Sequence, residues 1–151
     1  MKRTHLRSKD LNIELAHYNL DLSKKDQVEL VENKFKILLI NHQPAFFYTE
    51  NKAIPTLKFL QTHPALLKTV TIDMGAVKFI IQWADVMRPG IVAIDESILK
   101  DDIITIIDEK NKKPIAIGKA LFSQAEMQVM KTGKVIKNIH YVGDELWKLE
   151  V

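Results

Sequence analysis

The residues best suited to chemistry in this sequence are a helix start at Gly75-Ala76 and a turn at Arg88-Pro89-Gly90. Glycine and alanine leave room for another molecule, and the free N–H groups at a helix N-terminus attract phosphate. Arginine donates two parallel hydrogen bonds to a phosphate and stacks on nucleobases. Each motif taken alone is more often an ordinary tight turn. The two motifs lie within twenty residues of each other, and each is a candidate for a phosphate contact.

Four lysines and one tyrosine are candidates for the rim of such a site: Lys78, Lys119, Lys134, Lys137 and Tyr141. Alternation along a strand would place Lys137 on one face with Val135 and Tyr141. Sites for nucleic acids often combine cations with an aromatic ring on which a base stacks. The alternative is a set of solvated lysines beside a tyrosine that caps the core, and this second reading is favoured slightly for Tyr141.

Residue types argue against a catalytic or metal site. The 151 residues include no cysteine, which excludes disulfides, thiolate zinc sites and cysteine nucleophiles. The five histidines are scattered, without a His-x-x-x-His pair, and neither a nucleophile elbow nor a phosphate-binding Gly-rich loop is present. His140 is expected to be structural. The sequence therefore predicts a protein that is not an enzyme and needs no cofactor or metal.

The charge is modest and unevenly distributed. The net charge is +3, with 11 basic and seven acidic side chains in residues 1–70 and 11 and 12 in residues 71–151. A basic arm at Lys2, Arg3, Arg7 and Lys9 is expected to be a solvated terminus, or else to extend an RNA footprint. No apolar run approaches the length of a membrane helix and no secretory signal is visible, which predicts a cytoplasmic protein.

The pattern along the chain predicts an α+β protein with two domains, residues 1–68 and 69–151. The first is a small α/β domain: a short helix within residues 9–22 capped by Ser8 or Asp10, then an antiparallel meander. The second combines a helix over residues 75–82, capped by Asp73, and a helix from Ser123 to Met130 with strands that close into a small mixed β-barrel. Gly133 is expected to stop the later helix. The expected strands span residues 27–32, 35–40, 46–49, 91–94, 103–107, 114–121 and 135–141.

Residues of about 69–149 resemble a PUA domain in the order of their motifs. These motifs are Asp73-Met74-Gly75-Ala76, then Ala84 to Ile91, then Lys100-Asp101-Asp102, then Ile117-Gly118-Lys119-Ala120, and finally Asn138 to Trp147. The ending resembles that of the MCTS (malignant T-cell amplified sequence) group and its archaeal relatives, in which a pre-PUA domain comes first. Members of this family often have glycine where this chain has Trp83.

The resemblance implies binding of structured RNA, a tRNA acceptor end or ribosomal RNA, in translation initiation or recycling. By the same analogy the partner is a protein with an SUI1-like domain or the small ribosomal subunit, and the chain itself is a monomer. Two alternatives remain open: an RNA-specificity subunit for a modifying enzyme of the pseudouridine synthase or archaeosine transglycosylase type, and a protein-interaction adaptor.

Overall fold

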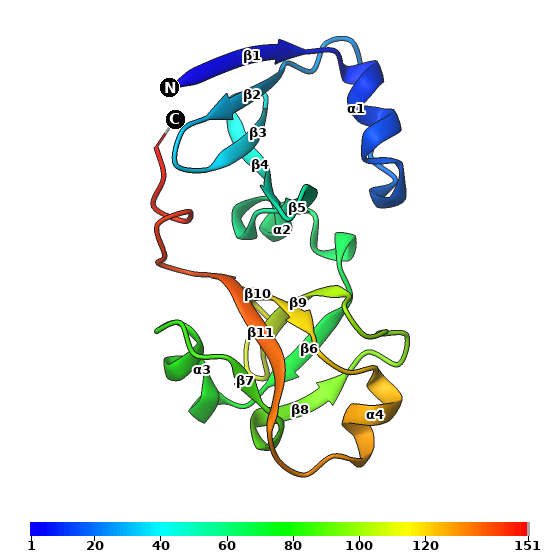
Figure 1. Cartoon of the computed structure of the whole chain (residues 1–151), viewed down its shortest axis with the longest axis vertical. Coiled ribbons are helices and arrows are strands. Elements are labelled where there is room, and N and C mark those ends of the chain that lie inside the picture. Colours follow the sequence, from blue (N-terminus) through cyan, green and yellow to red (C-terminus); the bar gives the residue numbers. More distant parts are fainter. Residues whose placement is uncertain (151) are drawn as a thin grey trace. The chain divides into compact units, whose positions relative to one another are not determined.

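The computed structural model of this protein describes residues 1–150, with four α-helices and eleven β-strands in that range (Figure 1). Contacts divide the chain into two compact units, residues 1–59 with 149–150, and residues 60–148. Each unit holds both helix and sheet, which confirms the predicted α+β class. The predicted domain boundary between residues 68 and 69 stays a prediction.

The first unit is built on one antiparallel sheet in which the strands follow each other in chain order, β1-β2-β3-β4-β5. Its elements are β1 (Lys2–Leu6), α1 (Ser8–Glu14), β2 (Val28–Glu32), β3 (Lys36–Ile40), β4 (Gln43–Thr49), β5 (Lys52–Pro55) and the start of α2 (Leu57–Thr62). Leu11 of α1 and Leu15, which follows the helix, pack against Val28, Leu38 and Phe46 of this sheet. The meander is therefore confirmed, and α1 supplies its cover.

Two details of this unit differ from the sequence prediction. The basic start of the chain is not a frayed arm but strand β1, which pairs with β2 and joins Arg3 Nη1 to the buried carboxylate of Glu29 at 3.3 Å. Helix α1 begins after Arg7, which makes no side-chain cap, so neither Ser8 nor Asp10 is the cap residue. Both differences arise from pairing with a strand more than twenty residues away, which local patterns do not reveal.

The second unit is built on a mixed sheet in the order β7-β11-β10-β9-β6-β8, in which only β6 and β9 pair in parallel. Its elements are β6 (Thr69–Ile72), α3 (Met74–Ile80), β7 (Val86–Met87), β8 (Ile91–Ile94), β9 (Ile103–Asp108), β10 (Pro114–Ala120), α4 (Gln124–Val129) and β11 (Lys134–Tyr141). Its core consists of buried aliphatic side chains from these strands, with Ile80 from α3 and Met127 from α4.

Two predicted helix caps are confirmed. The Asp73 carboxylate accepts a hydrogen bond from the Ala76 N–H, and Ser123 and Glu126 form a complete capping box at α4. Gly133 does not stop α4, because that helix already ends at Val129, while Gly133 has a φ of 94° in the turn that leads into β11. The caps were predictable because they depend on residues three positions apart.

In the middle of the mixed sheet, the space around Gly118 is too small for a side chain. This residue is buried in β10, where the register with β11 shifts between Ile117 and Gly118. A Cβ atom placed there would collide with Ile136 Cγ2 and lie 2.9 Å from the Lys137 carbonyl oxygen. Glycine therefore lets β10 and β11 approach closely beside the bulge.

Candidate nucleic-acid interface

A groove of about 450 Å³ lies between α3 and the turn at residues 88–90. The predicted residues Gly75, Ala76, Pro89 and Gly90 all line it. The two segments touch closely, since the Asp73 N–H donates to the Gly90 carbonyl at 2.9 Å and a Cβ on Gly90 would lie 3.1 Å from the Ala76 Cβ. The structure thus places the helix start and the Pro-Gly corner on one groove.

The groove is apolar, with Phe79 and Met87 as its large exposed side chains, 56% and 51% exposed. Among the described residues, the lining includes no lysine or arginine, so contacts of the predicted cations with a ligand stay a prediction. The charged residues of the lining are Asp73 and Asp85. Both carboxylates accept backbone N–H groups, Asp73 that of Ala76 and Asp85 that of Asn138. The lining therefore suits a flat apolar group such as a nucleobase better than a phosphate.

At the start of α3, two of the N–H groups that the sequence predicted to be free already donate to carboxylates. The Ala76 N–H donates to Asp73 Oδ1 at 2.8 Å, and the Met74 N–H donates to Glu109 Oε1 at 3.3 Å. Two carboxylates thus occupy the positive helix end and disfavour an anion there. Glu109 lies 35 residues away in the sequence, so its contribution could not be predicted locally.

Arg88 is half-buried and is not the solvated cation of an exposed turn. Its Nε donates to the Met127 carbonyl at 2.6 Å and its Nη1 to the Ile91 carbonyl at 3.4 Å. The side chain therefore ties the turn to the end of α4. No carboxylate is ion-paired with it among residues 1–150, so its positive charge still adds to the local potential.

The four predicted lysines lie outside the groove, in three places. Lys78 Nζ lies 5.1 Å from the centre of the Phe79 ring, beside the groove. Lys119 and Lys137 face each other across β10 and β11, and Lys119 Nζ is 3.9 Å from Asp101 Oδ1. Lys134 Nζ is 3.5 Å from Asp85 Oδ2.

The predicted face shared by Lys137 and Val135 is wrong. Val135 is fully buried and Lys137 exposed. The register of β11 against β7 shifts between Lys134 and Ile136, and this irregularity breaks the alternation on which the prediction depended. Tyr141 is half-buried, and its ring centre lies 5.6 Å from that of the exposed Trp83.

Sequence reasoning missed a second group of cations, the exposed side chains of Lys110, Lys112 and Lys113 in the loop between β9 and β10. Glu109 anchors this loop, since its N–H donates to the Ile72 carbonyl and its carboxylate accepts from Met74. The lysines therefore stand beside the start of α3. The signal in the sequence is the basic run itself, three lysines within four residues.

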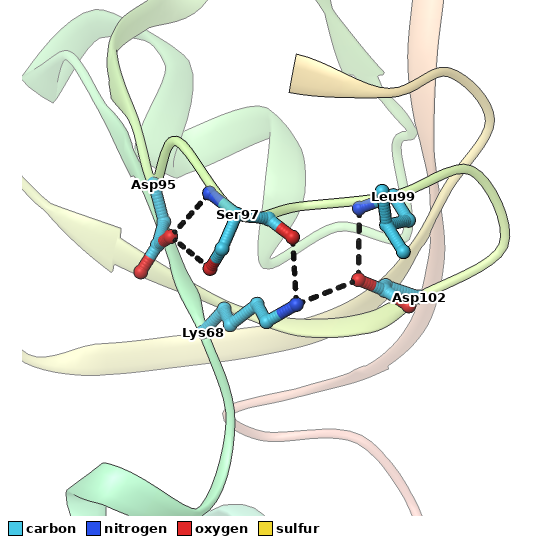
Figure 2. Close-up of polar contacts among 5 residues, drawn as sticks. All are labelled: Lys68, Asp95, Ser97, Leu99 and Asp102. Atoms are coloured by element: carbon cyan, nitrogen blue, oxygen red, sulfur yellow. Dashed lines mark hydrogen bonds and ion pairs between the residues drawn. The ribbon is translucent and has the colours of Figure 1, made fainter.

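A second hollow, lined by Thr69, Thr71, Ala93, Ile94, Asp95, Glu96 and Ser97, is a poorer candidate for a polyanion. Figure 2 shows that two of its polar residues are already paired: the Asp95 carboxylate accepts from the Ser97 Oγ and N–H, which lowers the pKa of Asp95. Lys68 Nζ donates to the Ser97 carbonyl at 2.7 Å and lies 3.2 Å from Asp102 Oδ2. Anionic Asp95 and Glu96 would repel phosphates.

His140 and Asp144 form a buried pair, with His140 Nδ1 and Asp144 Oδ2 2.7 Å apart. Burial alone would raise the pKa of Asp144, but its hydrogen bonds with His140 and with the Trp147 and Tyr141 N–H groups outweigh this and lower it. The pair fastens the turn after β11, which agrees with the structural role expected for His140. Among residues 1–150 no group of three potential ligand side chains is placed to hold a metal.

This lowered pKa predicts an acid dependence of stability. Ionised Asp144 stabilises the fold above the pKa of an unfolded aspartate, about 4, and that contribution is lost as the pH falls through the lower folded value. Asp144→Asn is therefore expected to lower the thermal midpoint at neutral pH and to approach the unsubstituted protein in acid. Thermal unfolding followed by circular dichroism across this range measures the gap, and a gap that stays constant would contradict the role of Asp144.

Family models match both parts of the chain. The PUA domain matches residues 68–142, and a domain of unknown function (DUF1947) matches residues 5–63. None of the described helices is long and apolar enough to cross a membrane.

Relatives match over most of the chain. An uncharacterized protein of Methanocaldococcus jannaschii is 41% identical over 157 residues, covering 99% of this chain and 97% of the relative. Translation machinery-associated protein 20 of Eremothecium gossypii is 30% identical over 138 residues, covering 86% of this chain and 76% of the relative. The crystal structure of a hypothetical protein from Pyrococcus horikoshii is 32% identical, with a TM-score of 0.84 over 97% of this chain and 98% of that one. The chain therefore belongs to the family of PUA-domain proteins that includes translation machinery-associated protein 20 and malignant T-cell-amplified sequence 1.

Proposed function

We propose that this protein binds RNA through the groove between α3 and the 88–90 turn, as a non-catalytic component associated with translation. The observation that carries the proposal is the groove itself, an apolar slot whose lining includes Gly75, Ala76, Pro89 and Gly90. Proteins read RNA mostly at unpaired loops and ends, where an unstacked base can enter such a slot. Membership of a family with a translation machinery-associated relative supports the cellular role.

The charges around the slot suit the phosphates of such a strand. Lys78 lies beside Phe79 on α3, and the loop with Lys110, Lys112 and Lys113 adjoins the start of the same helix. A base in the slot would leave its phosphates outside, at these lysines, where cations and phosphates set affinity without reading sequence. Arg88 contributes through its charge while it holds the turn in place.

The RNA is structured and has an unpaired end, a tRNA acceptor end or a ribosomal RNA segment, and the protein acts as a monomer in the cytoplasm. An SUI1-domain protein or the small ribosomal subunit completes the assembly. Lys119, Lys134, Lys137 and Tyr141 extend the contact beyond the groove. These finer assignments follow the family resemblance together with the exposure of the lysines.

Met87→Glu tests this function. A carboxylate at this exposed groove position would repel the strand and remove apolar contact with the base, while the core stays intact. Because one stacked base contributes about 1–3 kcal/mol, we expect roughly tenfold weaker binding or more. Fluorescence anisotropy with a hairpin RNA that carries a short single-stranded 3′ tail measures the affinity.

Val129→Glu is the matched control, because Val129 is an equally apolar residue, 80% exposed at the end of α4 and absent from the groove lining. Its affinity should stay close to that of the unsubstituted protein. Equal losses in both variants would mean that only net charge matters, and no loss in either would reject the groove. Binding that does not weaken with salt would favour a protein-interaction adaptor, since phosphate contacts give a steep salt dependence.

A further inference from the structure

Trp83 is an unusual residue for its position. It follows α3, has a φ of 78°, and leaves 57% of its side chain exposed. Left-handed backbone is costly for a bulky residue and easy for glycine, which the family resemblance predicts here. Because the indole is largely exposed, it contributes little hydrophobic stabilisation to the fold. For the stability of the fold alone, glycine would therefore suit this position better than the strained, exposed tryptophan.

The backbone around Trp83 is held firmly. The Trp83 N–H donates to the Ile80 carbonyl at 3.2 Å, and the buried Asn138 Nδ2 donates to the carbonyls of Ile80 and Ala84 at 2.9 Å each. The ring itself leans on Tyr141, with the two planes inclined by 49°. Such support fixes the direction of the ring before any ligand arrives, which lowers the ordering cost of binding.

Two lysines of β11 lie near the segment that follows Trp83. Lys134 Nζ lies 3.5 Å from Asp85 Oδ2, two residues after Trp83. Lys137 is exposed and precedes Asn138, whose N–H donates to the same Asp85 carboxylate. A surface with an exposed π-face and nearby lysines suits a ligand with flat bases and regular negative charges, which is single-stranded nucleic acid. A peptide would need an acidic sequence to use both features.

We propose that Trp83, backed by Tyr141, is a stacking platform for an unpaired base of the bound RNA, outside the groove lining and separate from Met87. The inference rests on the proposed function, because it assigns a second contact to the same RNA.

Trp83→Gly distinguishes a role in binding from a role in folding, because the two roles predict different changes in RNA affinity and in the thermal midpoint. Glycine adopts a φ of 78° without strain, so the thermal midpoint should hold or rise, while affinity for the tailed hairpin RNA falls about tenfold from loss of stacking. Trp83→Phe should retain part of the affinity. A lower midpoint with unchanged affinity would show a merely structural ring and overturn the proposal.

A spectroscopic readout uses the small number of tryptophans, Trp83 and Trp147. Titration with the tailed hairpin RNA should quench the emission of the unsubstituted protein, and this quenching should disappear in Trp83→Gly. If Met87→Glu weakens RNA binding and Trp83→Gly does not, stacking on Trp83 is rejected while RNA binding in the groove is supported. If neither variant weakens RNA binding, both proposals are rejected. If Trp83→Gly abolishes binding of a protein partner but leaves RNA affinity unchanged, stacking on Trp83 is likewise rejected.

Discussion

Asn138→Ala is expected to lower the free energy of unfolding by about 1–3 kcal/mol, the usual cost of leaving a carbonyl away from water without its donor. The Asn138 side chain is 2% exposed, and its amide donates to the carbonyls of Ile80 and Ala84, 54 residues or more away. Ile80 keeps a second donor, the Trp83 N–H, so the loss falls mainly on Ala84 and on packing. Chemical denaturation followed by circular dichroism measures the change.

Gln61→Ala is the control, since it removes a side-chain amide from an exposed position of α2. We expect it to stay within about 0.5 kcal/mol of the unsubstituted protein. The Asn138→Ala substitution also removes Asn138 Oδ1, which is buried without a hydrogen-bond partner, and this offsets part of the loss in the free energy of unfolding. Equal stabilities of the two variants would show that Asn138 does not hold the segment between α3 and β7.

Gly118→Ala is expected to lower the free energy of unfolding by a similar amount, about 2–3 kcal/mol. Overpacking a close-packed core costs about 1–3 kcal/mol, and here a backbone atom prevents the neighbouring strand from moving aside. The new Cβ would meet Ile136 Cγ2, the Lys137 carbonyl at 2.9 Å and Ile106 Cδ1 at 3.3 Å. A side chain can change its rotamer, but the carbonyl belongs to β11, which is paired on both edges. The midpoint of thermal unfolding should therefore fall by several degrees or more.

Gly75→Ala makes the same chemical change where there is space. Its Cβ would approach only Asp73 Oδ1, at 3.4 Å, and alanine favours helix over glycine. Its stability is expected to equal or exceed that of the unsubstituted protein. If both glycine variants lost the same stability, the close approach of β10 and β11 would not explain the requirement at Gly118.

Features governed by neighbouring residues could be predicted from the sequence. Asp73 caps α3 and Ser123 with Glu126 caps α4, since each bond spans three residues. The β-branched run at residues 103–107 became β9. The placement of Gly75-Ala76 beside Pro89-Gly90 followed from the resemblance to the PUA family and not from local pattern.

Features governed by distant contacts could not be predicted. Arg88 was expected in solvent, but the carbonyl of Met127 accepts from it across 39 residues. Glu109 reaches the start of α3 from 35 residues away and takes the place assigned to a phosphate. Strand β1 forms because β2 offers it an edge. In each case a partner far along the chain decides whether a polar group is free or already satisfied.

The most direct test of the groove is a solution NMR titration of the whole chain with the tailed hairpin RNA. The account predicts that the amide signals of Gly75, Ala76, Met87 and Gly90 shift together as the RNA is added, while those of Thr71 and Ala93 in the second hollow stay in place. Unmoved groove signals with shifts confined to the second hollow, or no shifts at saturating RNA, would contradict it.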